Sequence, residues 1–177
     1  GLDENGRVIY LGTFSKTLFP ALRLAYLVLP PDLVEPFARA LNELYREGQT
    51  MQQAVLARFI TEGHYASHIR RMRAVYAARH DALIAAIARH FGTTLPVIGG
   101  DAGLHLVLGL PARVDDAAVV QRAQRAGVTT RPMSLYHVPG QVQSAPAKGL
   151  LLGYGAVREE EIARQFGTLA RVVQPFL

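Results

Sequence analysis

The chain lacks cysteine, contains very little lysine and has no long apolar run. Without cysteine it cannot form disulfides, thiolate zinc sites or a cysteine nucleophile. No hydrophobic stretch approaches the ~20 residues that a membrane-spanning helix needs. The 177 residues begin with Gly1 and carry no charged-then-apolar leader. These features fit a reducing compartment such as the cytoplasm, and we expect the chain to be a piece of a longer protein.

The scarcity of lysine makes the two lysines that remain informative. Of the 19 basic residues only Lys16 and Lys148 are lysines, and the formal net charge is +5. A GC-rich gene with abundant Ala and Gly codons would explain the excess of arginine without any function. A lysine retained against that bias still has one distinct property, because lysine can lose its proton and act as an amine nucleophile whereas arginine effectively cannot.

Half of the residues are hydrophobic, which at this length suffices for one full domain or two small lobes. Apolar segments predict strands at 7–11 and 24–29, joined by a loop over 12–23. Because the segment 24–29 is apolar throughout, we expect a strand buried on both faces of a parallel-type sheet. Apolar residues at helical spacing then predict three helices, at about 31–44, 51–61 and 66–91.

The composition shifts after Gly92, where a compact α+β lobe is expected. Asp115 can cap a helix that extends to Ala126 and stops at Gly127. A last helix begins at three glutamates. Strands are predicted at about 95–98, 104–108, 128–130 and 150–154, with a Gly/Asp turn at 99–101 and a loop at 132–149. The sequence therefore predicts an α/β chain of two lobes, residues 1–92 and 93–177.

The loop over residues 12–23, GTFSKTLFPALR, gathers polar groups between two predicted strands. It contains the hydroxyls of Thr13 and Ser15, the amine of Lys16 and the guanidinium of Arg23. A phosphate needs several convergent donors and a cation, and arginine offers a planar fork for it. An amine becomes nucleophilic when it is partly desolvated or close to another cation. These groups suit pyridoxal 5′-phosphate (PLP), an aldehyde that bears a phosphate and condenses with lysine.

Two simpler interpretations of this loop are open at this point. The string Ser-Lys-Thr resembles the Gly-Lys-Thr end of a nucleotide-binding P-loop, but this interpretation fails on spacing because Ser15 and Tyr10 stand where that motif requires glycine. Alternatively, Lys16 is an ordinary surface lysine, which composition alone favours because lysine is mostly exposed.

A wider resemblance favours the PLP interpretation. It is carried by the strings YLGTFSKTLFPALRLAYLVLP, HIRRMRAVYAARHDAL and GLHLVLGLP. These resemble segments of fold-type I, aspartate-aminotransferase-like PLP enzymes and, more narrowly, of the MocR branch of GntR-type bacterial regulators. In that branch a winged helix-turn-helix is fused to an aminotransferase-like domain. Arg23 follows Lys16 one residue sooner than in the common aminotransferase motif, as in these regulators and in aminoadipate-type aminotransferases.

The resemblance implies a fold, a cofactor and a site. The chain would be the C-terminal portion of a fold-type I PLP-dependent transferase, with 1–92 in the large domain and 93–177 forming the small domain. Lys16 would carry PLP as an aldimine. Thr13, Ser15 and Arg23 would bind its phosphate. In an enzyme of this kind Lys16 would also move a proton between the substrate α-carbon and the cofactor.

Two departures from the aminotransferase pattern bear on activity. The arginine that grips the substrate α-carboxylate aligns with Leu151, which cannot bind a carboxylate, and the nearest cations are Lys148 and Arg131. The family residues that clamp the cofactor ring precede the lysine and would lie before Gly1. We therefore expect weak or no PLP retention by this chain alone, and a domain that senses PLP or an unusual amine.

The resemblance thus implies the effector domain of a cytoplasmic MocR/GntR-type transcriptional regulator. Its homodimer would bind DNA through an N-terminal winged helix-turn-helix and not through this chain, with PLP or a small-molecule amine as effector and no membrane partner. The alternative is a PLP-dependent aminotransferase of the aminoadipate type. A third interpretation, a nucleic-acid surface on the His/Arg-rich stretch 64–80, lacks the interleaved aromatics that stack on bases.

Three histidines and a tyrosine have simpler structural explanations. His64 and His68 are four residues apart but lack an acidic or thiol partner. Gly63 is expected to break the helix there, so no metal site is predicted. We expect His105, in an apolar strand, to be packed and hydrogen-bonded, and Tyr136, in the long loop, to be a packing aromatic.

Overall fold

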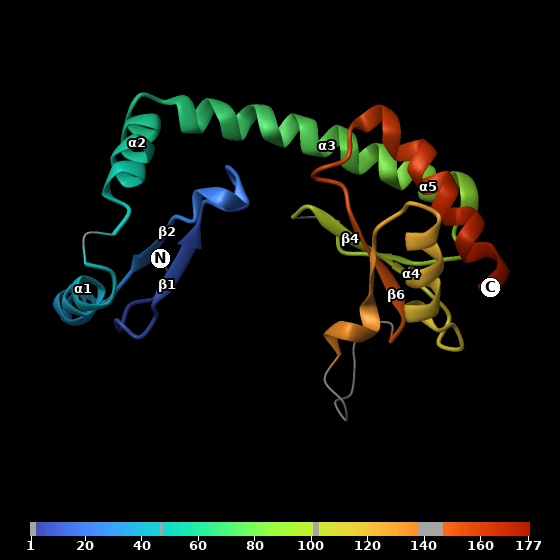
Figure 1. Cartoon of the computed structure of the whole chain (residues 1–177), viewed down its shortest axis with the longest axis horizontal. Helices are drawn as coiled ribbons and strands as arrows, with labels where there is room; N and C mark the ends of the chain where they lie inside the picture. Colours follow the sequence, from blue (N-terminus) through green and yellow to red (C-terminus); the bar gives the residue numbers. More distant parts are fainter. Residues whose placement is uncertain (1–2, 47, 101–102, 138–146) are drawn as a thin grey trace. The chain divides into compact units, whose positions relative to one another are not determined.

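The computed structural model describes residues 3–46, 48–100, 103–137 and 147–177 (Figure 1). Residue contacts divide the chain into two compact units, Gly1–Arg71 and Met72–Leu177, which are described separately. This division falls inside helix α3 (His64–Phe91), and the domain division expected after residue 92 stays a prediction. In the described residues, no helix is long and apolar enough to cross a membrane.

The N-terminal unit contains a two-stranded sheet followed by helices (Figure 1). Strands β1 (Tyr10–Thr13) and β2 (Ala25–Val28) run antiparallel, and the loop between them includes a short 3-10 turn over Pro20–Leu22. Helices α1 (Pro31–Tyr45) and α2 (Thr50–Thr61) follow, and α3 starts in this unit. Proline suits the first turn of α1 because the amide that it lacks would have no helical partner there.

The expectation of a doubly buried strand in a parallel-type sheet at 24–29 is wrong for this structure. Strand β2 pairs antiparallel with β1, and all four of its residues are exposed. The chain returns from Thr13 to Ala25 without a crossover helix, and a parallel return normally needs one. A continuous apolar run is typical of a covered strand, but it does not reveal the direction of the neighbouring strand. The first strand also starts at Tyr10, later than the predicted 7–11.

The C-terminal unit contains a four-stranded antiparallel sheet, with the two central strands supplying most of the pairing. Helix α4 (Asp116–Arg125), helix α5 (Glu159–Val173) and the C-terminal part of α3 pack on it. In spatial order the strands are β3 (Val97–Ile98), β4 (His105–Gly109), β6 (Gly149–Gly153) and β5 (Arg131–Pro132).

One face of this sheet forms the hydrophobic core of the unit. Alternate residues of β4 and β6 are buried, as the two-residue period of a strand requires. The buried leucines of these two strands are Leu106, Leu108, Leu150 and Leu152, and the glycines at the paired ends, Gly109 and Gly149, are buried as well. The predicted apolar stripe of the last helix is confirmed, because all four of its residues are buried: Ile162, Phe166, Leu169 and Val173. On the opposite face Val107 and Leu151 are only half-buried, so that face is less covered.

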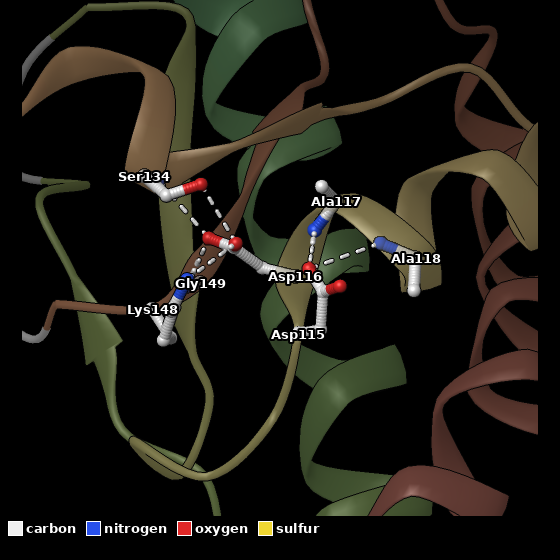
Figure 2. Close-up of polar contacts among 7 residues, drawn as sticks. All are labelled: Asp115, Asp116, Ala117, Ala118, Ser134, Lys148 and Gly149. Atoms are coloured by element: carbon white, nitrogen blue, oxygen red, sulfur yellow. Dashed lines mark hydrogen bonds and ion pairs between the residues drawn. The ribbon is translucent and has the colours of Figure 1, made fainter.

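Local signals at α4 behave as predicted. The Asp115 carboxylate accepts hydrogen bonds from the amides of Ala117 and Ala118 at 3.0 and 3.3 Å (Figure 2). Gly127, with a φ of 79°, follows the helix.

The short strand expected at 128–130 forms instead at β5, directly after that segment, and the Thr130 hydroxyl donates to the Leu151 carbonyl at 2.7 Å. Pro132 is tolerated there because β5 is an edge strand. Asp101 of the predicted turn and residues 138–146 of the predicted long loop lie outside the described residues.

Candidate functional site

Lys16 lies in a tight turn directly after β1. We call residues 14–18 the Lys16 turn. It is closed by a hydrogen bond of 2.8 Å from the Leu18 amide to the Phe14 carbonyl, and the Phe14 amide donates to the Leu24 carbonyl at 3.1 Å. These bonds fix the main chain while the side chain of Lys16 is exposed. The segment is therefore ordered around an amine that solvent and ligands can reach.

The other predicted phosphate ligands lie at the two ends of the same loop. The Ser15 amide donates to the Thr13 hydroxyl at 3.2 Å, which places these two residues side by side before Lys16. Arg23 is exposed and has a φ of 53°, in the left-handed region. Such a conformation costs roughly 1–2 kcal/mol for a residue with a side chain, and it is found preferentially at ligand-binding positions.

The chemistry of this donor set fits PLP. An amine, two hydroxyls and a guanidinium come from a single loop, which matches an aldehyde and a phosphate. None of the ion pairs formed by the described residues involves Lys16 or Arg23. Both cations are therefore available to an anionic ligand.

A cluster of aromatic rings supports the strand that leads into this turn. Gly12 lies opposite Tyr26 in the sheet, and a Cβ on Gly12 would be 2.2 Å from the Tyr26 ring. Tyr26 contacts the rings of Phe14 and Tyr10, with centroids 5.6 and 6.1 Å apart. The neighbouring Tyr10 hydroxyl raises the pKa of Tyr26. Sequence reasoning missed this cluster, although a glycine opposite a tyrosine in a predicted strand pair was an available signal.

Helix α3 contacts the Lys16 turn through two residues of the His/Arg-rich stretch 64–80, Tyr65 and His68. The His68 Nε2 atom lies 2.9 Å from the Thr17 carbonyl oxygen. The Phe14 and Tyr65 rings meet edge to face, with centroids 5.9 Å apart. The sequence offered no signal for these contacts, because 51 residues separate His68 from Thr17.

The expected helix break at Gly63 lies before both His64 and His68, since α3 begins at His64. His64 lies 3.4 Å from the Glu62 carboxylate, whereas His68 contacts the Thr17 carbonyl. In the part of the chain that the structure describes, no group of three or more metal-ligating side chains forms.

In the C-terminal unit, the structure distinguishes the two cations that stand near Leu151 in the sequence. Leu151 pairs with Val107 on one side and with Arg131 on the other. Directly opposite residues of neighbouring strands share a face of the sheet, so Arg131, which is exposed, is the cation beside position 151. Lys148 is engaged elsewhere, because its Nζ atom lies 3.4 Å from a carboxylate oxygen of Asp116.

Asp116 is fully buried and was not recognised from the sequence. Its carboxylate accepts hydrogen bonds from the Ser134 amide at 3.0 Å, the Ser134 hydroxyl at 2.7 Å and the Gly149 amide at 3.2 Å (Figure 2). Burial is the largest influence on the pKa of Asp116 and opposes ionisation, but these donors and Lys148 together outweigh it, so the pKa lies below its ordinary value. Asp116 thus joins the start of α4 to Ser134 and to the start of β6.

Two expectations for this unit are wrong. His105, expected to be packed and hydrogen-bonded, is exposed at the start of β4. Tyr136, expected to be a packing aromatic, retains 53% of its surface. His105 belongs to the less covered face, opposite Gly153. An apolar strand pattern indicates one buried face but does not guarantee that the other face is covered.

Residues 1–149 match the model of the aminotransferase class I and II family. The chain belongs to this family. It is 40% identical over 162 residues to the uncharacterized HTH-type transcriptional regulator YhdI of Bacillus subtilis, an alignment that covers 92% of this chain and 34% of the relative. It is also 40% identical over 159 residues to the probable rhizopine catabolism regulatory protein MocR of Rhizobium meliloti, with 89% and 31% covered.

Among solved structures, this member of the aminotransferase family resembles the kynurenine aminotransferase of Pyrococcus horikoshii. The TM-score is 0.85 at 27% identity, and the match covers 99% of this chain and 43% of that protein, which was solved in complex with PMP. The expected fold, the C-terminal portion of a fold-type I PLP-dependent transferase, is confirmed. The resemblance to MocR/GntR-type regulators is confirmed by the relatives.

PLP is the cofactor of the family to which the chain belongs. The chain spans about a third of the length of the curated relatives that it matches. The activity, effectors and partners of a whole protein of this kind are therefore matters for proposal.

Proposed function

We propose that the chain is the C-terminal part of a PLP-binding, aminotransferase-like effector domain in a MocR/GntR-type transcriptional regulator. The observation that carries the proposal is the Lys16 turn. Its main chain is fixed by hydrogen bonds, and the exposed amine of Lys16 directly follows Thr13 and Ser15 in the loop. The 40% identity to regulators supports the same conclusion. In this proposal the division of the domain after residue 92 separates the Lys16 loop from the four-stranded sheet.

The residues of the loop have distinct roles in this proposal. Lys16 would hold PLP through a bond to its amine nitrogen. The hydroxyls of Thr13 and Ser15 and the Arg23 guanidinium would hold its phosphate. When bound, PLP supplies an electrophilic carbon with which amines can react. An arginine at position 16 would keep the charge but could not form this bond.

Regulation rather than turnover is supported by position 151. Leu151 offers no donor to an α-carboxylate where the resemblance places an arginine in aminotransferases. We propose PLP itself or a small-molecule amine as the effector, a homodimeric cytoplasmic parent protein, and DNA binding through an N-terminal winged helix-turn-helix. In this scheme the chain alone binds PLP weakly and does not bind DNA specifically.

An aminotransferase of the aminoadipate type is the second candidate. It is favoured by the likeness to a solved aminotransferase and by Arg131, which stands opposite Leu151 and offers a cation at this position. The two candidates differ in the parent protein. A regulator supplied with PLP and a panel of amino acids should show little turnover, whereas brisk transamination would establish the enzyme.

The assignment of Lys16 is tested by trapping the bond. The chain is incubated with PLP, the carbon–nitrogen double bond is reduced with borohydride, and the modified peptides are mapped by mass spectrometry. We expect the adduct mainly on Lys16, its loss in Lys16→Arg, and its retention in the matched control Lys148→Arg, which removes the other lysine amine but keeps a positive charge. An adduct distributed equally over both lysines would contradict the proposal.

Without reduction, we expect the PLP absorbance to be lost on dialysis of the chain. Stoichiometric PLP that survives dialysis would show that the chain alone holds the cofactor tightly, contrary to the expected weak retention.

A further inference from the structure

Helix α3 holds the Lys16 turn on both sides of Lys16. After the lysine, His68 Nε2 lies 2.9 Å from the Thr17 carbonyl oxygen. Before it, the Phe14 and Tyr65 rings form a T-shaped pair with a centroid distance of 5.9 Å and an interplanar angle of 75°. Tyr65 and His68 are three residues apart in α3, and so they lie on one face of the helix.

The bond from His68 has a defined direction. A carbonyl oxygen can only accept, so the Nε2 atom must carry the hydrogen and donate it. Both residues are partly buried, which limits competition from water. Among the hydrogen bonds of the described residues, this is the one that reaches the Lys16 turn from outside the β1–loop–β2 segment.

We infer that His68 is a positioning residue for the Lys16 amine and acts through the carbonyl of Thr17. The inference rests on the proposed role of Lys16 in binding PLP. Fixing the carbonyl next to Lys16 restricts rotation of the turn and therefore the direction of the lysine side chain. Such control is effective because a displacement of about 1 Å in a reacting group can slow a reaction about 100-fold.

A purely structural role for His68 makes a different prediction. If His68 only stabilised the N-terminal unit, its replacement would lower the reactivity of Lys16 together with the helical content of that unit, wherever the replacement side chain places its N–H. Lys148 is the only other lysine, and its amine pairs with Asp116 in the C-terminal unit. The ratio of PLP adducts on Lys16 and Lys148 therefore corrects for the extent of labelling, and circular dichroism separates a loss of helix from a change in the Lys16 turn.

The decisive comparison is between His68→Gln and His68→Asn. The glutamine side chain can place an N–H near the position of Nε2, whereas asparagine is one carbon shorter and cannot. We expect brief exposure to PLP followed by borohydride to give a near wild-type adduct ratio in His68→Gln. The ratio should fall on the order of tenfold in His68→Asn and in His68→Ala.

His64→Ala is the matched control, because His64 is exposed on the same helix and its nearest charged partner is Glu62. It should leave the ratio unchanged. Circular dichroism of each variant shows whether the helices form, and the Gln/Asn pair decides the matter if the alanine variant unfolds.

The outcomes separate the two claims. No Lys16 adduct in the wild-type chain would overturn the proposed function and this inference with it. A wild-type adduct on Lys16 with the same ratio in His68→Asn, His68→Ala and the wild type would overturn the inference alone. A low Lys16/Lys148 adduct ratio in His68→Asn, together with a near wild-type ratio in His68→Gln, supports the positioning role of His68.

Discussion

The two units differ in how much of their apolar surface they bury. In the described residues, Leu24 and Leu56 are the buried hydrophobic side chains of the N-terminal unit, and the rest of the buried hydrophobic set belongs to the C-terminal unit. Helix α1 contains no buried residue, and Leu44 in it retains 77% of its surface. In contrast, Leu108, Leu150 and Val173 of the C-terminal unit are completely buried.

This difference separates the source of stability from the proposed chemistry. The C-terminal unit has a core that can drive folding, since burial of apolar surface is the main favourable term. The Lys16 turn belongs to the unit that buries less, and it is held by directional contacts such as the hydrogen bond to Thr17. Regions with few buried apolar contacts open most readily, so we expect the site to open before the C-terminal core does.

Because the C-terminal unit buries more apolar surface, we expect the largest loss of unfolding free energy when one of its core leucines is truncated. Leu108→Ala removes a side chain with no exposed surface, and such changes cost about 2–5 kcal/mol of unfolding free energy. Leu44→Ala, the matched control on the exposed helix α1, should change the unfolding free energy by less than about 0.5 kcal/mol. Urea denaturation followed by circular dichroism measures both. Equal losses of unfolding free energy in the two variants would contradict the inference that the C-terminal unit owes more of its stability to buried apolar surface.

The next effect concerns the buried carboxylate of Asp116. Asp116→Asn keeps the shape of the side chain but leaves one acceptor oxygen, which can serve the amides of Ser134 and Gly149 only if the new NH2 group faces the Ser134 hydroxyl and the Lys148 amine. Leaving a buried polar group without a partner costs about 1–3 kcal/mol. We expect a loss of this size in urea denaturation, together with faster hydrogen exchange at the Gly149 amide. An unfolding free energy equal to that of the wild type would argue against the observed network around Asp116.

The pH dependence of stability provides a separate test of Asp116. Its pKa is lowered in the folded state, so the folded chain binds this proton less readily than the unfolded chain. The resulting stabilisation is complete above the unfolded pKa of ~3.9 and is lost as the pH falls through the lower folded value. The difference in unfolding free energy between wild type and Asp116→Asn should therefore shrink on acidification. A difference that stays constant down to about pH 2 would contradict the shift.

Sequence patterns predicted those features that depend on neighbours along the chain. The stripe Ile162, Phe166, Leu169 and Val173 was visible because helical periodicity alone identifies the buried face of α5. The candidate loop was visible because Thr13, Ser15, Lys16 and Arg23 fall within one short segment.

The features that were missed depend on tertiary packing. Asp116 is buried by Ser134 and Gly149, which are distant in sequence, and nothing local distinguishes it from the exposed Asp115. The bond between His68 and Thr17 is hidden for the same reason. The antiparallel direction of β2 follows from the short connection to β1 and not from its apolar residues.

The smallest loss of unfolding free energy is expected at Asp115. This residue makes only local contacts, whereas the contacts of Asp116 are tertiary. Asp115 is exposed and caps α4 through the amides of Ala117 and Ala118, whereas its neighbour Asp116 is fully buried. Asp115→Ala should cost about 1 kcal/mol, because two amides of the first turn lose their acceptor. Asp115→Ser should recover most of that loss, since serine is also a good N-cap residue.

The same rescue should fail at position 116, where a serine cannot reach both Ser134 and Gly149 as the carboxylate does. Urea denaturation of Asp115→Ala, Asp115→Ser and Asp116→Ser at one pH provides the comparison. If Asp116→Ser were as stable as Asp115→Ser, the buried carboxylate would be no more than a second cap, and the stability of the C-terminal unit would depend on its apolar core alone.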